Sequence, residues 1–465
     1  MKIKELKEKY NLEELASNAL KSLEDFEFAE FFFEEASEES ITAENKSITA
    51  ATSSLRRGVA IRVFNKGSIF HAYTTDLSKR GIDELVEFVK SMVRNYSTSK
   101  IGIELTSPAE EKFTHEAVIS SPEIKVSKLR EAIDKAFSYS YTQSFMGLVR
   151  ESARSIFIKN SLGVTAEDDY VKTGSFVKII ATKDGYTDFS YKTRAFSKPA
   201  SELDLVELVE DAIRIAEVNF SARPTPAGNF PIVVAHGQGA IVFHEACGHA
   251  LEGDSIANET SVFSKKLGEK IAVENLNLID DGTVPLSYGS YNFDDEGIPS
   301  QKTPLIENGI LVGYMLDLKS SLQLGMKPTG NGRRQTYKHF PIPRMRNTII
   351  TPTKPDGSAE DIIASVKKGI YVKYLGGGQV DVITGDFVFS MREAYMIENG
   401  KITHPIRGGT IAGNGPEVLK SIVAFGDDFE MDSGGGMCGK EGQGAPVSQG
   451  QPTIKIAKLL VGGVG

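Results

Sequence analysis

The sequence predicts an α+β protein, with strand meanders covered by helices in its N-terminal half and a mostly β domain carrying one HExxxH helix in its C-terminal half. Its 465 residues exceed what one hydrophobic core supports, so more than one domain is expected. A series of strand-like runs followed by a helix occurs twice. A proline-rich linker follows, and after it the sequence consists mainly of strand-like runs separated by glycines. We place the domains at residues 1–110, 111–221 and 222–465.

The first domain opens with an amphipathic helix at about residues 11–23. Strand-like FEFAEFFFEE follows, and then three alternating runs, SITAENKSITAATSS, GVAIRVFN and GSIFHAYT. The turn Asn65-Lys66-Gly67 joins the last two runs. A second amphipathic helix begins near Asp83 and completes the order of helix, strands and helix.

The second domain repeats this order. A helix is predicted at about residues 126–138, followed by the strands IFIKNSLGVTAEDD, SFVKIIAT and YTDFSYKT, with a turn at Lys183-Asp184-Gly185. A helix at about 202–218 closes the domain. Two meanders that each end in a helix suggest an internal duplication, although two α+β layers can also resemble each other by chance.

The third domain follows a linker at residues 221–228, where prolines and small residues sustain neither helix nor strand. PIVVA is predicted as a buried strand, and a helix follows at about 238–251. Later strands, separated by glycines, include ILVGYMLD, GIYVKYL and DFVFSMREAYMIE. These runs predict a mostly β domain around the helix.

Turn and helix-cap residues predict two hairpins and one further helix in this domain. Glu-Asn-Gly at 307–309 and at 398–400 predicts two hairpins, because Asn-Gly readily takes positive φ. The run SAEDIIASVKK, at about 358–368, predicts a helix with a serine cap at Ser358 and a terminal glycine at Gly369.

The strongest chemical signal is HEACGH, in which His244 and His249 flank Glu245. Imidazole nitrogens bind zinc, and the carboxylate can accept a proton from an activated water. The spacing is one residue longer than HExxH, so on an α-helix the histidines would lie roughly 140° apart instead of about 40°. A π-helical widening would return them towards one face, and Gly248 makes that distortion easier. The alternative is a chance pairing on an amphipathic helix.

A catalytic zinc usually has three protein ligands, so a third is expected. The chain has two cysteines, and Cys438 lies in SGGGMCGKEGQGAPVSQGQPT, a segment unlike a regular helix or strand. A lone thiol in such a loop favours a ligand or a nucleophile, whereas Cys247, inside the helix, is expected to pack in the core. His236 and His339 are spare candidates. His115 precedes Glu116 but has no second histidine after it.

Three weaker patterns have simpler interpretations. Residues 434–440 fit GxxxxGK, but Glu441 stands where a phosphate-binding loop needs Ser or Thr and no helix follows. Gly376-Gly377-Gly378 is typical of a turn, with the wall of a peptide cleft as the alternative. The acidic residues of the third pattern are interpreted as a solvated loop. They are Asp427, Asp428, Glu430 and Asp432.

Four arginines lie between the HExxxH motif and Cys438, namely Arg333, Arg334, Arg344 and Arg346. A solvated basic face is the default interpretation. The alternative is that they hold a substrate carboxylate or stabilise a loop of the site through bidentate hydrogen bonds.

Composition limits the classes of function. The net charge of −9 disfavours direct contact with nucleic acid. The chain has no run of about eighteen apolar residues, so a membrane span is not expected. The charged N-terminus lacks the apolar core of a signal peptide. Two cysteines give no disulfide framework, so the cytoplasm is the expected compartment.

The run FHEACGHALEGD, the segment PTGNGRRQTYKHFPIPRMRNT from Pro328 to Thr348, and MCGKEGQGAPVSQGQPT together resemble the TldD/PmbA metallopeptidases. The resemblance spans nearly the whole chain and is strongest after residue 230. It implies zinc on His244, His249 and Cys438, with Glu245 as the catalytic base. The intact HExxxH motif is similar to the TldD-type subunit, whereas the PmbA-type relative lacks it.

The resemblance also implies a peptide substrate and a partner, either a second copy in a homodimer or a PmbA-type paralogue in a heterodimer. Exposed strands of the third domain could bind an extended or unfolded peptide by β-augmentation. The competing hypothesis is a metal-stabilised regulatory or scaffold protein without hydrolytic activity, which the family's label as a modulator of DNA gyrase suggests. Glu245 argues against it, since a structural metal site needs no base.

Overall fold

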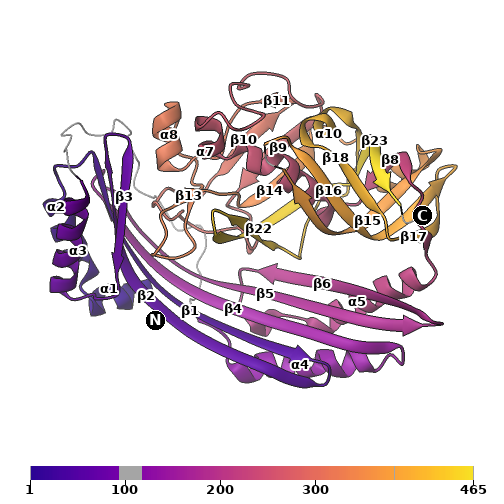
Figure 1. Cartoon of the computed structure of the whole chain (residues 1–465), viewed down its shortest axis with the longest axis horizontal. Helices are drawn as coiled ribbons and strands as arrows, with labels where there is room; N and C mark the ends of the chain where they lie inside the picture. The colour runs from indigo at the N-terminus through magenta and orange to yellow at the C-terminus, as the bar shows by residue number, and fades with distance from the viewer. Residues whose placement is uncertain (1, 94–117, 382, 464–465) are drawn as a thin grey trace.

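The computed structural model describes residues 2–93, 118–381 and 383–463. A long curved sheet forms one side of the molecule, and a β-rich domain packs onto its concave face (Figure 1). The predicted α+β class is confirmed. The predicted boundary between residues 110 and 111 lies outside the described residues, so the division of the N-terminal half stays a prediction.

The curved sheet has six antiparallel strands in the order β3-β2-β1-β4-β5-β6. Its strands are β1 (Phe28–Glu44), β2 (Ser47–Asn65), β3 (Ser68–Thr74), β4 (Thr142–Asn160), β5 (Thr165–Lys183) and β6 (Tyr186–Phe196). Strands of up to 19 residues replace the shorter runs expected from sequence. The exposed polar residues that interrupt the apolar pattern still pair with neighbouring strands, so the strands continue through them.

The sheet is buried on both faces, as three consecutive phenylalanines show. Phe31 and Phe33 pack in a cluster with the first helices, whereas Phe32 packs with Phe293 and Tyr337 of the C-terminal domain. Successive side chains point to opposite faces of a strand, so this run serves both layers. The convex face carries α1 (Ile3–Lys9), α2 (Leu12–Ser22), α3 (Lys79–Met92), α4 (Pro122–Phe137) and α5 (Leu205–Phe220).

The repeated order of strands and helix is confirmed, and the two meanders join through antiparallel pairing of β1 with β4. The duplication itself stays a prediction. Both expected hairpin turns form, with positive φ at Lys66 and Gly67 and at Asp184 and Gly185. The expected continuous strand IFIKNSLGVTAEDD is wrong, because a turn containing Gly163 at φ 86° separates β4 from β5.

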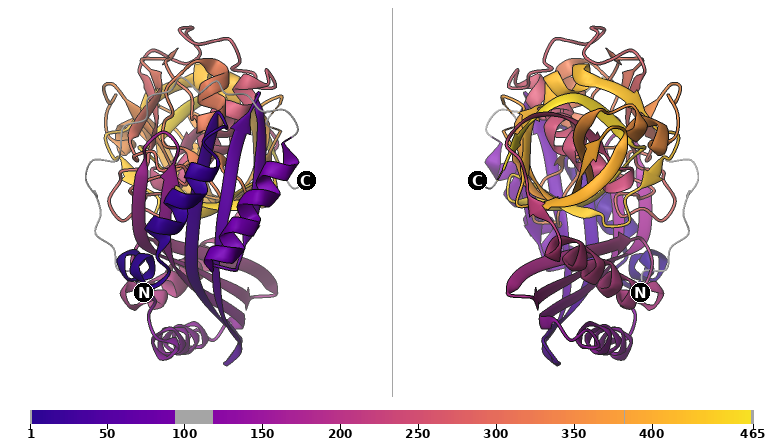
Figure 2. Two further views of the ribbon diagram at one scale, coloured as in Figure 1. Left: turned by 90° about the vertical axis from the view of Figure 1, so that its left-hand side faces the viewer. Right: turned by 90° about the vertical axis from the view of Figure 1, so that its right-hand side faces the viewer.

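Five strands of the C-terminal domain close into a barrel, because β15 pairs with β8 on one side and with β16 on the other. The ring is visible end-on in Figure 2. Its strands are β8 (Gly228–Val234), β15 (Lys368–Val380), β16 (Asp386–Glu398), β18 (Thr410–Asn414) and β23 (Ile454–Gly462). Three further strands extend it, namely β7 (Arg223–Pro224), β17 (Lys401–Arg407) and β19 (Ile422–Phe425).

A second sheet lies beside the barrel. Its strands are β9 (Leu276–Asp281), β10 (Lys302–Glu307), β11 (Ile310–Leu311), β14 (Asn347–Pro352), β20 (Glu430–Met431), β21 (Gly436–Lys440) and β22 (Gln443–Gln451). A small pair consists of β12 (Gly332–Arg333) and β13 (Ile342–Pro343). The remaining helices are α6 (Ile241–Phe243), α7 (Gly253–Ala257), α8 (Leu318–Leu324), α9 (Ala359–Ala364) and α10 (Gly415–Ser421). None of the helices in the described ranges has the length and apolar character for crossing a membrane.

Several local predictions for this domain are corrected. The linker at 221–228 contains the short strand β7, which pairs with β17. ILVGYMLD is a strand only at β11, and the glycines 376–378 continue β15 instead of turning. Ser358 caps α9 as expected, but the helix ends at Ala364 and Gly369 belongs to β15. Both Asn-Gly turns form, with positive φ at Asn308 and Asn399.

Candidate metal centre

The HExxxH segment is one continuous but irregular helix that packs against β15 and β16 of the barrel. A 3₁₀ turn at Gly237–Ala240 leads into α6, a π-helical turn covers His244–Gly248, and a 3₁₀ turn at His249–Leu251 ends the segment. The widened turn brings the two histidines to one side, with ring centroids 5.7 Å apart and planes inclined by 79°. The helical widening expected from the spacing is confirmed.

Gly248 has a different role from the one expected. Its φ of −57° is ordinary for a helix, so backbone freedom is not what requires glycine here. A Cβ atom at this position would lie 2.1 Å from Sδ of Met345. Glycine is therefore required for close packing between the helix and the segment that leads into β14.

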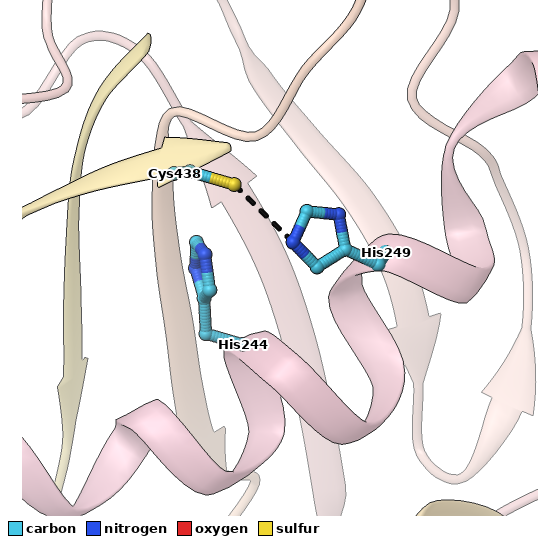
Figure 3. Close-up of side chains that lie close together, drawn as sticks. All are labelled: His244, His249 and Cys438. Atoms are coloured by element: carbon cyan, nitrogen blue, oxygen red, sulfur yellow. Dashed lines mark hydrogen bonds between the residues drawn. The ribbon is translucent and has the colours of Figure 1, made fainter. Parts of the chain in front are cut away.

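Cys438 approaches the histidines from a separate element, the hairpin of β21 and β22 (Figure 3). Its Sγ lies 3.2 Å from Nε2 of His249, and one ligand atom from each of His244, His249 and Cys438 lies within 4.8 Å of the others. The expectation of an irregular loop is wrong. The glycine-rich segment pairs as a hairpin, with positive φ at Glu441 and Gly442 in its turn.

The electrostatics of Cys438 suit a metal ligand. Burial opposes the charged thiolate, but hydrogen bonds and charge from His244 and His249 outweigh it and lower the pKa of the thiol to about 5. The thiolate is the form that binds metals. Imidazole nitrogen and thiolate sulfur are also both usual zinc donors, so the residues present fit this ion.

Both imidazoles have a polar contact at Nδ1. Nδ1 of His249 donates to Oε2 of Glu252 at 3.1 Å, and Nδ1 of His244 lies 3.1 Å from Oγ1 of Thr348. Such outer contacts orient a ring and leave its Nε2 free for a metal. Lys440 in turn donates to Glu252 at 2.9 Å. Burial opposes the charged form of Glu252, but Lys440 and His249 outweigh it and lower the pKa of Glu252 to about 2.

Sequence reasoning missed Glu252, Thr348 and Lys440. Two signals pointed to them: Glu252 lies three residues after His249, and Lys440 lies two residues after Cys438 on the same face of a strand. Thr348 had no local signal, because only the pairing of β14 with β22 brings its strand to the site.

Glu245 faces the open side of the site. Its Oε2 lies 3.8 Å from Nε2 of His249, and 31% of its side chain is exposed. The adjoining cleft has a volume of about 490 Å³, and its lining includes Gln379 and Val380 of β15 and Gly439 and Lys440 of β21. Cys247 is completely buried in the core, as expected, and burial raises the pKa of its thiol to about 12.

The interpretation of the four arginines as a solvated basic face is wrong, because Arg333, Arg334, Arg344 and Arg346 are all buried. Arg344 fits the alternative, since it donates to the carbonyls of Cys438 and Gln443 at the two strands of the hairpin. Arg333 donates to the carbonyl of Pro446 on β22 at 2.8 Å. These two arginines therefore stabilise the hairpin that carries Cys438.

The other candidate residues lie elsewhere. His236 contacts the carboxylates of Asp428 and Glu430, and His339 contacts Thr336, so the structure does not place either in the His/His/Cys group. His115 lies outside the described residues. The acidic stretch is only partly a solvated loop, because Asp428 accepts hydrogen bonds from Thr453 and Asp432 accepts one from Gln449.

Family models match three stretches of the chain. The PmbA/TldA metallopeptidase domain 1 matches residues 29–95, the central domain matches 119–220, and the C-terminal domain matches 227–463. A Metalloprotease TldD homolog of Buchnera aphidicola is 36% identical over 466 residues, which cover 95% of each chain. A Zinc metalloprotease TldD homolog of Saccharolobus solfataricus is 30% identical over 462 residues, covering 94% of this chain and 96% of that protein.

The fold also matches a solved structure, TldE from Thermococcus kodakarensis, with a TM-score of 0.77 and 22% identity over 96% of this chain and 99% of that chain. At that identity the likeness concerns the fold alone. The family models and the nearly full-length relatives carry the assignment, and the chain belongs to the PmbA/TldD family of metallopeptidases.

Proposed function

We propose that this chain is a zinc-dependent peptidase that hydrolyses peptide bonds in extended or unfolded peptides, with Glu245 as general base. The observation that carries the proposal is the convergence of His244, His249 and Cys438 beside a partly exposed carboxylate, Glu245, in an open cleft. The zinc in the name of the Saccharolobus solfataricus relative supports the choice of metal.

His244, His249 and Cys438 would hold the zinc, which when bound supplies Lewis-acid polarisation of the scissile carbonyl and of the attacking water. Glu245 accepts the proton of that water at its carboxylate and returns it to the leaving amine. Glu252 and Thr348 keep the two rings oriented during this exchange, because they contact the Nδ1 atoms and leave Nε2 of each ring for the metal.

The strand edges beside the cleft support binding of an extended peptide. β15 pairs with β8 only at Ile370–Val372, and beyond that point its partner among the described strands is β16. The second edge of β15 at Gln379 and Val380 therefore lies beside the cleft without a strand partner in the described part of the chain. A peptide could add there as a strand, which recognises backbone more than sequence.

By resemblance, the protein acts as a dimer, either with a second copy or with a PmbA-type paralogue. TldE is the PmbA-type subunit of this family, so the match to TldE supports a fold shared by the TldD-type and PmbA-type subunits. We also propose that it works in the cytoplasm, because the two cysteines are free thiols and one of them belongs to the proposed metal centre.

The competing function is a metal-stabilised scaffold without hydrolysis. A structural zinc is usually closed by a fourth protein ligand, whereas here the group contains three ligands and Glu245 faces the cleft. The deciding experiment measures metal content and peptide cleavage together for wild type, Glu245→Ala and His244→Ala.

We expect about one zinc per chain in wild type and in Glu245→Ala, with cleavage lost in both variants and zinc lost only from His244→Ala. Unchanged turnover in Glu245→Ala would show that Glu245 is not the base. Zinc retention without cleavage of any unfolded peptide by the wild type, alone or with its partner, would favour the scaffold.

A further inference from the structure

A second cavity lies between the concave face of the N-terminal sheet and the C-terminal domain, with a volume of about 110 Å³. It touches the hairpin of β21 and β22 through Met437, Ala445 and Pro446. Met437 and Cys438 are neighbours in a strand and point to opposite faces of it. The cavity and the metal cleft therefore lie on opposite sides of one hairpin.

The lining of this cavity carries more basic than acidic side chains. Six basic residues line it, against three acidic ones, Glu38, Asp294 and Asp295. Burial, followed by the charge of Glu296, raises the pKa of Asp294 well above its usual range. The basic residues are Arg56, Arg150, Arg154, Lys172, Arg333 and Arg334.

Two of these arginines have N–H groups with no hydrogen-bond acceptor in the described part of the chain. Arg154 and Arg334 are 8% and 4% exposed. Within the described ranges, Nη2 of Arg154 and Nε and Nη1 of Arg334 have no hydrogen-bond partner. Their remaining donors are used, by Glu34, Asp295 and Tyr170 for Arg154 and by Glu30 and the carbonyl of Asp295 for Arg334. Buried donors are rarely left without an acceptor, so these N–H groups indicate a missing one.

Positive charge in the cavity is also incompletely balanced. Arg333 donates to the carbonyls of Met345 and Pro446, and no carboxylate in the described part of the chain pairs with it. Nζ of Lys172 has no carboxylate partner among the described residues either, and it donates to Oγ of Ser197 at 3.2 Å and to the carbonyls of Tyr288 and Ser290, so its three N–H groups already have acceptors. Burial, and then the charge of Arg333, lower the pKa of Lys172 well below its usual range.

We propose that this cavity binds a small oxyanion, a phosphate or a carboxylate group, between the guanidinium groups of Arg154, Arg333 and Arg334. Guanidinium donors match such oxygens in geometry and charge. The oxyanion has two sources, a free ion or the terminal carboxylate of a peptide. Binding here does not depend on the peptidase activity.

Two adjacent arginines of β2 provide a matched pair for the test. Arg56 pairs with Glu34 and lines the cavity, whereas Arg57 pairs with Glu35 and does not line it. Their side chains are similarly exposed, at 31% and 28%. We therefore expect either substitution to disturb the sheet to a comparable degree, and only Arg56→Gln to remove a charge from the lining of the cavity.

The experiment is calorimetric titration of the zinc-loaded protein with inorganic phosphate. We expect saturable binding to wild type, weakened about fivefold or more by Arg56→Gln and unchanged by Arg57→Gln. Arg334→Met should abolish binding, and if that variant fails to fold, the Arg56 and Arg57 pair still decides. His249→Ala should bind phosphate as wild type does, because the metal lies across the hairpin.

The result that overturns the proposal is an absence of saturable binding at millimolar phosphate, as expected if water alone fills the cavity. An equal loss in Arg56→Gln and Arg57→Gln, or a loss of binding in His249→Ala, overturns it as well. Competition between phosphate and a short peptide then separates the sources. A peptide that competes with a free carboxylate but not as its amide identifies the substrate end, and no competition by either identifies a free ion.

Discussion

The carboxylate of Glu252 lies 3.1 Å from Nδ1 of His249, while Nε2 of the same ring lies 3.2 Å from Sγ of Cys438. One side of the imidazole is therefore committed to a buried carboxylate, and the other faces the proposed metal position. Because Glu252 is 1% exposed and also accepts from Lys440, this contact is held in a fixed geometry.

Glu252→Gln should weaken zinc binding by roughly 10- to 100-fold, as the loss of such an outer carboxylate commonly does. The fold should persist, because the amide keeps an acceptor for Lys440. Zinc affinity is measured by competition with a chromogenic chelator. Glu245→Gln is the matched control, since it removes the other carboxylate beside His249 and should keep wild-type zinc affinity while losing cleavage. Equal zinc affinities for the two variants would contradict the orienting role of Glu252.

Gly248→Ala should destabilise the protein by about 1–3 kcal/mol, because the new methyl group meets Sδ of Met345 in a packed core. Gly439→Ala is the control. Gly439 also neighbours a proposed metal ligand, Cys438, but a Cβ there has no heavy atom within 4 Å. Chemical denaturation of both variants measures the difference, and a wild-type midpoint for Gly248→Ala would show that the helix and Met345 separate easily.

Asp168 should make stability depend on pH. Burial raises its pKa from 3.8 to about 7, although hydrogen bonds from Asn292 oppose the shift. Between these pH values the folded protein keeps a proton that the unfolded chain releases, so this residue lowers the free energy of unfolding as pH rises from about 4 to 7. The contribution is up to roughly 4 kcal/mol.

Asp168→Asn removes that titration. Its free energy of unfolding should therefore fall less than that of wild type over the same pH range, as measured by denaturation at each pH. Parallel pH profiles for the two proteins would mean that Asp168 is ionised in the folded state.

The protein should be a dimer in solution, and cleavage of longer peptides should require its partner. Light scattering gives the mass of the purified chain, and the assay is repeated after addition of a PmbA-type paralogue from the same organism. A monomer that cleaves long peptides alone at full rate would show that the metal-bearing subunit is sufficient.

The metal helix could be predicted from sequence because its chemistry is local. The five-residue spacing of His244 and His249 requires a widened turn for both rings to share a side, and the structure contains that turn. The hairpins at Asn308 and Asn399 could be predicted for the same reason, since the sign of φ is set by the residue itself.

Tertiary structure alone decided what surrounds those local features. Closure of the barrel depends on pairing between strands far apart in the chain. Polar residues interrupt the apolar pattern of the long strands in the curved sheet, so the sequence pattern predicted shorter strands. Arg344 looked like a surface cation, because only the folded chain brings it beneath the carbonyls of the hairpin. Thr348 likewise acquires its contact with His244 from strand packing, since 104 residues separate the two in sequence.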